Sequence, residues 1–123
     1  MSFESDIYSV LAVAGVTSLV SDRIYPAHAS EGTARPYVVY TPIFSEPIYH
    51  LDGSTNKHTR IRLQVDCYSE DVDQAAQIAR AVIDAVPQSG ALHRTAHNDQ
   101  DLGLEEDTRL FRRLIEFTIF YRS

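Results

Sequence analysis

The apolar residues near the start of the chain recur at the spacing of an amphipathic helix. We therefore expect a helix over residues 2–14, with Ser2 as its cap and Gly15 as its stop. A short helical turn over residues 17–20 should follow, and residues 22–26 should then lead into a polar connection over residues 27–34. The apolar stripe of the first helix consists of Phe3, Ile7, Val10, Leu11 and Ala14.

A second helix is expected over residues 71–86. Asp71 is placed to cap it, Gln74 would complete a capping box, and Pro87 ends it. Its apolar arc is wider than one sheet contact needs, so either the first helix or a neighbouring subunit should cover the surplus. The arc comprises Val72, Ala75, Ala76, Ala79, Val82, Ile83 and Val86, widened by Ile78, Ala81 and Ala85.

Alternation of apolar and polar residues predicts a long strand over residues 57–68. A second long strand is predicted over residues 109–122, where alternate positions are apolar and both faces become apolar near the end. Two shorter strands are expected over residues 37–41, where Pro42 limits continuation, and over residues 92–96. The predicted core comprises Ile61, Leu63, Val65, Val82, Ile83, Ile115, Phe117 and Ile119. Cys67 lies on the same apolar face, which favours a small buried hydrophobe over a reactive thiol.

The order of these elements predicts an α+β fold, in which an antiparallel sheet carries helices on one face. The 123 residues suit a single domain over residues 1–123. No apolar run approaches the roughly 18 residues of a membrane-spanning helix, and the first residues lack the positive charge of a signal peptide. We expect a soluble protein that remains where it is made.

Residues 44–56 form an excursion with turn chemistry at Asp52 and Gly53, which indicates a projecting hairpin. Exposed apolar side chains on a small domain are unfavourable unless something covers them, so we expect contacts with another subunit or another protein. The alternative is that the segment folds back on its own sheet. The interface candidates are Phe44, Ile48, Tyr49 and Leu51.

Residues 97–108 are expected to form a polar, acidic loop. The spacing of its acids does not match a calcium-binding loop, because Leu104 and Leu110 occupy the positions of the required Gly and Glu. A solvated loop is favoured, and a divalent cation bridging subunits stays an alternative. The five acids are Asp99, Asp101, Glu105, Glu106 and Asp107.

The formal net charge of -6, with Lys57 as the only lysine, argues against a protein that grips nucleic acid. Four arginines could form a basic patch, but Asp66 and Glu116 lie on the same strands, and cross-strand ion pairs are the favoured interpretation. The arginines are Arg60, Arg62, Arg112 and Arg113.

Catalytic and metal-binding motifs are missing from the sequence. The five histidines show no HExxH pair and no cysteine partner at zinc spacing, and His93 and His97 lie in a strand-to-loop pattern rather than a helix. There is no Gly-x-Ser-x-Gly elbow and no Gly-rich phosphate loop. We expect neither an enzyme nor a resident metal or cofactor.

Several segments in order resemble the family of small phage tail-completion or tail-terminator proteins. They cover nearly the whole chain and comprise residues 7–11, Asp22-Arg23-Ile24-Tyr25-Pro26, residues 35–40, residues 62–68 with the helix after them, and residues 112–122. The loops over residues 44–56 and 97–108 carry no matching pattern.

The resemblance implies a structural, homo-oligomeric ring, usually hexameric, that terminates the tail tube and joins it to the head connector or stopper protein. The expected place is the head–tail junction of a virion made in the cytoplasm of a bacterial host. DNA would pass through the channel without specific binding, and the five acids are candidates for the channel or an end face; the alternative is an ordinary exposed loop. A head–tail stopper or adaptor, a small monomeric binding module and an uncharacterised enzyme stay as alternative functions.

Overall fold

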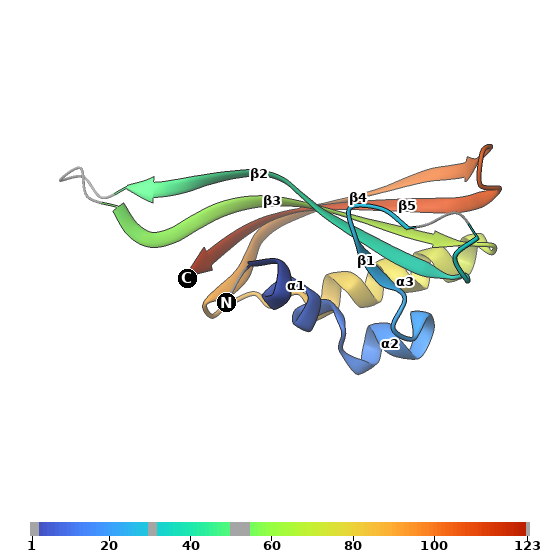
Figure 1. The fold of residues 1–123 in the computed structure, drawn as a ribbon, viewed down its shortest axis with the longest axis horizontal. Helices are drawn as coiled ribbons and strands as arrows, with labels where there is room; N and C mark the ends of the chain where they lie inside the picture. The colour runs from blue at the N-terminus through green and yellow to red at the C-terminus, as the bar shows by residue number, and fades with distance from the viewer. Residues whose placement is uncertain (1–2, 30–31, 50–54, 123) are drawn as a thin grey trace.

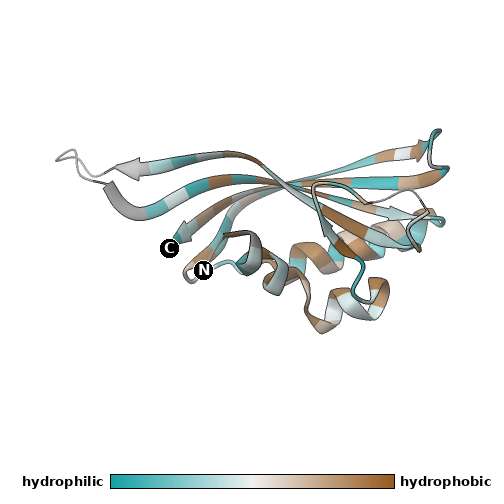
Figure 2. Cartoon of the chain, in the orientation of Figure 1, coloured by the Kyte–Doolittle hydropathy of each residue, from teal (hydrophilic) through white to brown (hydrophobic). Residues whose placement is uncertain are grey.

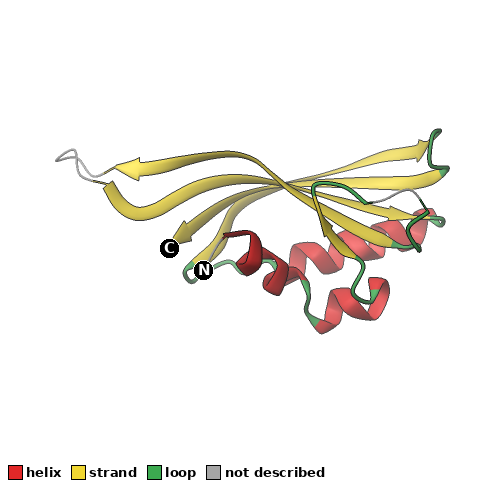
Figure 3. Ribbon diagram, viewed as in Figure 1, coloured by secondary structure: helices red, strands yellow, loops and turns green. Residues whose placement is uncertain are grey.

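The computed structural model describes residues 3–29, 32–49 and 55–122, and it folds them into one sheet with three helices (Figures 1 and 3). All three helices lie on the same side of the sheet. This arrangement confirms the predicted α+β class. In chain order the elements are α1 (Phe3–Leu11), α2 (Ala14–Val20), β1 (Ile24–Pro26), β2 (Tyr37–Tyr49), β3 (Thr55–Ser69), α3 (Val72–Ala85), β4 (Leu92–Glu105) and β5 (Leu110–Arg122).

The strands are ordered β1-β2-β3-β5-β4, so the closing strand β5 lies inside the sheet. β2, β3, β5 and β4 pair antiparallel, and the short β1 pairs parallel with Val38 to Tyr40 of β2. Beyond Tyr40 no described strand lies on the outer side of β2. Among the described residues the sheet therefore has two open edges: the short β1 with the outer part of β2 on one side, and the whole of β4 on the other.

The core lies between the sheet and the helices, and apolar residues gather there (Figure 2). Each predicted core residue is buried except Ile83, which is half-buried and packs against the rest. Cys67 is fully buried in the same cluster. The strand phases read from the sequence are therefore confirmed.

The helix α3 begins as predicted, because the side chain of Asp71 accepts a hydrogen bond from the backbone N–H of Asp73 at 3.3 Å. The predicted capping box is wrong. Gln74 instead accepts a hydrogen bond from the hydroxyl of Ser69, and Val72 at the start of the helix is 41% exposed. The wide apolar arc of α3 is covered by the two N-terminal helices, chiefly α2.

The single N-terminal helix predicted over residues 2–14 is also wrong. Its helical part ends at Leu11, and α2 begins at Ala14 with Gly15 inside it rather than after it. Leu11 and Val16 are both fully buried, yet five positions of one helix would turn them about 140° apart. The extended backbone of Val13 breaks the helix and lets both side chains enter the core. Ser2 lies outside the described residues.

The first long strand extends further than predicted. The sequence analysis predicted no strand over residues 24–26, yet these residues form β1, and β2 continues through Pro42 and Pro47 to Tyr49. Proline has no N–H to donate, but the outer part of β2 is an edge, where a missing donor is tolerated. The pairing register shifts between Pro42 and Phe44 and again between Pro47 and Tyr49, so each proline is accompanied by an irregularity.

The acidic loop predicted over residues 97–108 is largely strand. β4 runs to Glu105, and only a tight turn joins it to β5. Two register shifts, at Thr95 and Leu102, let this polar segment remain paired with β5. Gly103 has a φ of +72°, a conformation that glycine adopts without steric cost, and it stands just after the second shift.

Candidate assembly surfaces

The outer halves of β2 and β3 form a hairpin arm that extends beyond β1 and the helices (Figure 1). We define the arm as residues 41–49 and 55–62. It carries two adjacent exposed apolar side chains, since Ile43 is 45% exposed and Phe44 is 53% exposed. The predicted projecting hairpin is therefore present in its described part.

The structure describes only some of the predicted interface residues. Phe44 lies on the arm and is exposed, whereas Ile48 and Tyr49 are described only as part of the strand β2. Leu51 lies outside the described residues. The sequence analysis missed Ile43, because Pro42 was expected to end the strand; two consecutive apolar residues between prolines were the available signal.

Ion pairs hold the inner part of the arm on its polar face. Arg60 contacts Glu46 across the hairpin at 2.7 Å, and its guanidinium also lies 5.5 Å from the ring centre of Phe120. Arg62 contacts Glu116 of β5 at 3.3 Å. These cross-strand pairs agree with the structural interpretation of the arginines.

The five acids of the predicted loop lie in two different settings. Asp99 and Asp101 pair with β5 positions on the helix side of the sheet, and Glu105 pairs opposite Leu110 on the other side. Asp99 accepts two hydrogen bonds from Arg113, at 2.9 and 3.2 Å, and this interaction raises the pKa of Arg113. Asp99 and Arg113 therefore form a stable charged pair.

The remaining acids differ in what they contact. Asp101 accepts a hydrogen bond from the backbone N–H of Gly103 at 2.9 Å, and Glu105 accepts one from the hydroxyl of Thr108 at 3.2 Å. Glu106 and Asp107 lie exposed in the β4–β5 turn and have no ion pair among the described residues. They are the two acids most available to a partner.

A buried polar cluster lies on the face of the sheet opposite the helices. Asp66 is 4% exposed, and its carboxylate is contacted by Arg112 at 2.9 Å and by the amide of Gln64 at 3.0 Å. The guanidinium of Arg112 also lies 5.9 Å from the ring centre of Tyr68. Burial, partly opposed by the charge of Arg112, raises the pKa of Tyr68 to about 12.

The segment after β1 closes over this cluster and leaves a hollow of about 330 Å³ beside it. Tyr37, Val39 and Leu110 form a second small apolar cluster there, with Ala29 and Tyr25 packed against it. The carboxylate of Asp66 is bonded to Arg112 on one oxygen and to Gln64 on the other, so both of its oxygens take part in holding this cluster. The bond between Asp66 and Arg112 thus links β3 to β5, and residues 27–29, which follow β1, lie beside the same cluster.

The described part of the chain holds no group of three or more His, Cys, Asp or Glu side chains close enough to bind a metal ion. His93 and His97 lie on strand β4, and the register shift at Thr95 places them on opposite faces. His93 contacts the carbonyl of Gly90 at 2.7 Å, and His97 contacts Arg94 at 2.8 Å. Among the described residues no helix is long and apolar enough to cross a membrane.

The chain is similar to known proteins over nearly its whole length. The model of the family described as tail completion protein gp17 matches residues 6–122. No curated protein matches the sequence. Among solved structures, a chain from the virion of a native gene transfer agent particle has a similar fold, with a TM-score of 0.70 and 18% identity over 98% of this chain and 93% of that chain.

Proposed function

Because this chain belongs to the tail completion protein gp17 family, and is thus a structural protein of phage tails, we propose that it is one subunit of a ring that terminates the tail tube. The ring, hexameric by family resemblance, joins the tube to the head connector or stopper protein. Its place is the head–tail junction of the virion. It acts by assembly and not by catalysis.

The exposed apolar pair on the hairpin arm supports this proposal most directly. Ile43 and Phe44 are about half exposed on an arm that the sheet and the helices leave uncovered. Apolar surface that stays in contact with water contributes no stability to a monomer. In an assembly the same surface is buried, which favours association. The arm therefore contacts another subunit or the tail-tube protein, and the side chains of Ile48, Tyr49 and Leu51 belong to the same proposed interface.

The proposed role without catalysis is supported by the surroundings of two groups that could otherwise react. Asp66 is bonded on both oxygens, Cys67 lies in the core, and its thiol pKa is raised by burial. A nucleophilic cysteine needs the opposite, a lowered pKa and an accessible sulfur. These groups hold the fold together.

The acids of β4 and its turn suit a channel or end face past which DNA moves without binding. Asp99, Asp101, Glu105, Glu106 and Asp107 retain this proposed role, because carboxylates repel phosphates and release no counterions. The ion pairs of Asp99 and Glu105 reduce the repulsion between repeated subunits, which would otherwise oppose ring closure.

The experiment replaces Ile43 and Phe44 with serine in the particle that encodes this chain. Complete, DNA-filled particles should fall at least tenfold, and tails should be left unterminated, because the apolar contact is lost. Val72→Ser is the matched control, since Val72 is also an exposed apolar residue but lies on α3, away from the arm. Electron microscopy of particles and of purified protein provides the readout.

Each alternative predicts a different result. Normal tails of correct length that fail only to attach to heads would indicate a stopper or adaptor and contradict the terminator role. Removing the chain altogether without any effect on tails or heads would reject the structural proposal.

A further inference from the structure

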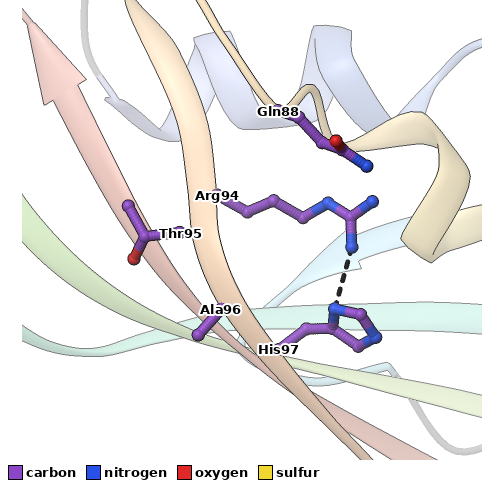
Figure 4. Close-up of a pocket in the computed structure, with 5 residues that line it drawn as sticks. All are labelled: Gln88, Arg94, Thr95, Ala96 and His97. Carbon is purple, nitrogen blue, oxygen red and sulfur yellow. Dashed lines mark hydrogen bonds between the residues drawn. The ribbon is translucent and has the colours of Figure 1, made fainter.

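The edge strand β4 carries a polar hollow of about 300 Å³ between the sheet and the segment after α3 (Figure 4). Arg94 is the only charged residue in its lining, and it has no carboxylate partner among the described residues. The lining consists of Gln88, Arg94, Thr95, Ala96 and His97.

The register shift at Thr95 creates this site. Arg94 and His97 are three positions apart, and in a regular strand they would point to opposite faces. Because Thr95 is an extra residue, Arg94 pairs opposite Ile119 and His97 opposite Phe117, which places both side chains on the helix side. The backbone N–H of Arg94 also donates to the carbonyl of Pro87 at 2.8 Å, which fixes the strand against the segment after α3.

The hydrogen bond between the two side chains determines the chemistry of the site. Nη1 of Arg94 lies 2.8 Å from Nδ1 of His97 (Figure 4). A guanidinium can only donate, so Nδ1 must accept and the imidazole proton lies on Nε2. Nε of Arg94 is buried without a hydrogen-bond partner. The hollow is thus lined by a guanidinium that has no carboxylate partner among the described residues, and an oxyanion satisfies such a positive charge.

A carboxylate fits these surroundings better than the phosphates of DNA. Asp99 and Asp101 lie on the same face of β4, a few positions along the strand. Asp99 is already paired with Arg113, but Asp101 has no ion pair among the described residues and opposes a chain of phosphates more than it opposes one carboxylate. Gripping DNA also needs several clustered cations rather than one arginine. A single carboxylate side chain needs only the one guanidinium.

We propose that this hollow receives a carboxylate of Glu106 or Asp107 from a second copy of the chain. These two acids are exposed and have no ion pair among the described residues. Within one molecule they cannot reach Arg94, because β4 separates the turn from the hollow by roughly 35 Å at about 3.3 Å per residue.

The inference rests on the proposed ring and gives it a contact. Two different patches on one chain that bind each other form a heterologous interface, which closes into a ring when the rotation between copies allows. The turn of one subunit would enter the hollow of the next. Glu106 and Asp107 would then lie between subunits, and Asp99, Asp101 and Glu105 would be left as candidates for the channel or end face.

The test uses charge reversal on each side of the contact, in the particle that encodes this chain. Arg94→Glu alone, and Glu106→Arg with Asp107→Arg, should each lower the yield of complete particles at least tenfold. The triple variant should recover most of the yield, because every subunit again presents opposite charges. Arg80→Glu is the matched control, since it reverses an exposed arginine on α3 and should leave the yield unchanged.

Thermal unfolding of each purified variant separates misfolding from lost assembly. If Arg94→Glu does not fold, Arg94→Gln removes the charge at similar length and should show the same loss of yield. Wild-type yield for a folded Arg94 variant would overturn the inference and leave the proposed function intact. A loss that the turn reversal does not repair would point to another anion, such as DNA phosphate, and would also overturn it. Complete particles made without the chain would reject the proposed function itself.

Discussion

Arg112 of β5 places both Nε and Nη2 at 2.9 Å from Oδ1 of Asp66 on the neighbouring strand β3. The carboxylate is almost entirely buried, and Gln64 donates to its second oxygen. Removing one partner of such a pair destabilises the fold, because the other charge is then left buried without compensation. The pair therefore fixes how β3 and β5 meet on the face away from the helices.

Replacing Asp66 with alanine should lower the free energy of unfolding by roughly 2 to 3 kcal/mol, because Arg112 loses its closest partner in a partly buried site. Glu116→Ala is the matched control. It breaks the more exposed contact with Arg62 and should cost less than about 1 kcal/mol. Urea unfolding of both variants measures the difference, and equal costs would contradict the importance of burial.

Truncating Phe117 to alanine should lower the free energy of unfolding by roughly 3 to 5 kcal/mol, because a fully buried aromatic side chain leaves a cavity. Phe44→Ala removes the same atoms from a side chain that is 53% exposed and should change stability by less than about 1 kcal/mol. Thermal unfolding compares the two variants. A stable Phe117→Ala protein would mean that the strand phase is wrong.

The thiol of Cys67 should be protected from alkylation in the folded protein. It is fully buried, and burial raises its pKa, so little thiolate forms at neutral or mildly alkaline pH. Iodoacetamide labelling followed by mass measurement should show no reaction in buffer and one modified cysteine in denaturant. Rapid labelling under native conditions would contradict the burial.

Stability should fall between about pH 10 and pH 12. The pKa of Tyr68 is raised from 10.0 to about 12 by burial, so over this range the unfolded chain releases a proton that the folded chain retains. The unfolded state then binds fewer protons, and the free energy of unfolding decreases as the pH rises. Tyr68→Phe should flatten this slope in denaturant titrations at several pH values, whereas an unchanged slope would assign it to other groups.

The sequence predicted the central part of the fold because two physical signals were strong there. Ile61, Leu63 and Val65 alternate strictly with polar residues, and Asp71 supplies a recognisable cap for α3. Both features act locally, through the two-residue period of a strand and the unpaired N–H groups of a helix start. They needed no knowledge of neighbouring elements.

The predictions failed where tertiary pairing outweighed local preference. Polar residues such as Asn98 and Gln100 favour a loop, but pairing with β5 holds them in a strand, and Gly103 absorbs the irregularity that this requires. Pro42 would end a central strand and is accepted at an edge. The site at Arg94 and His97 depends on a one-residue register shift, which no local pattern reveals.

The two open edges of the sheet share a property that bears on how separate copies of the chain behave in solution. Pro42 and Pro47 interrupt the donors along the outer part of β2, and the shifts at Thr95 and Leu102 distort β4. Edges of this kind resist pairing strand to strand with another molecule. Copies of the chain should therefore resist growth into fibres by edge-to-edge pairing, even at high concentration.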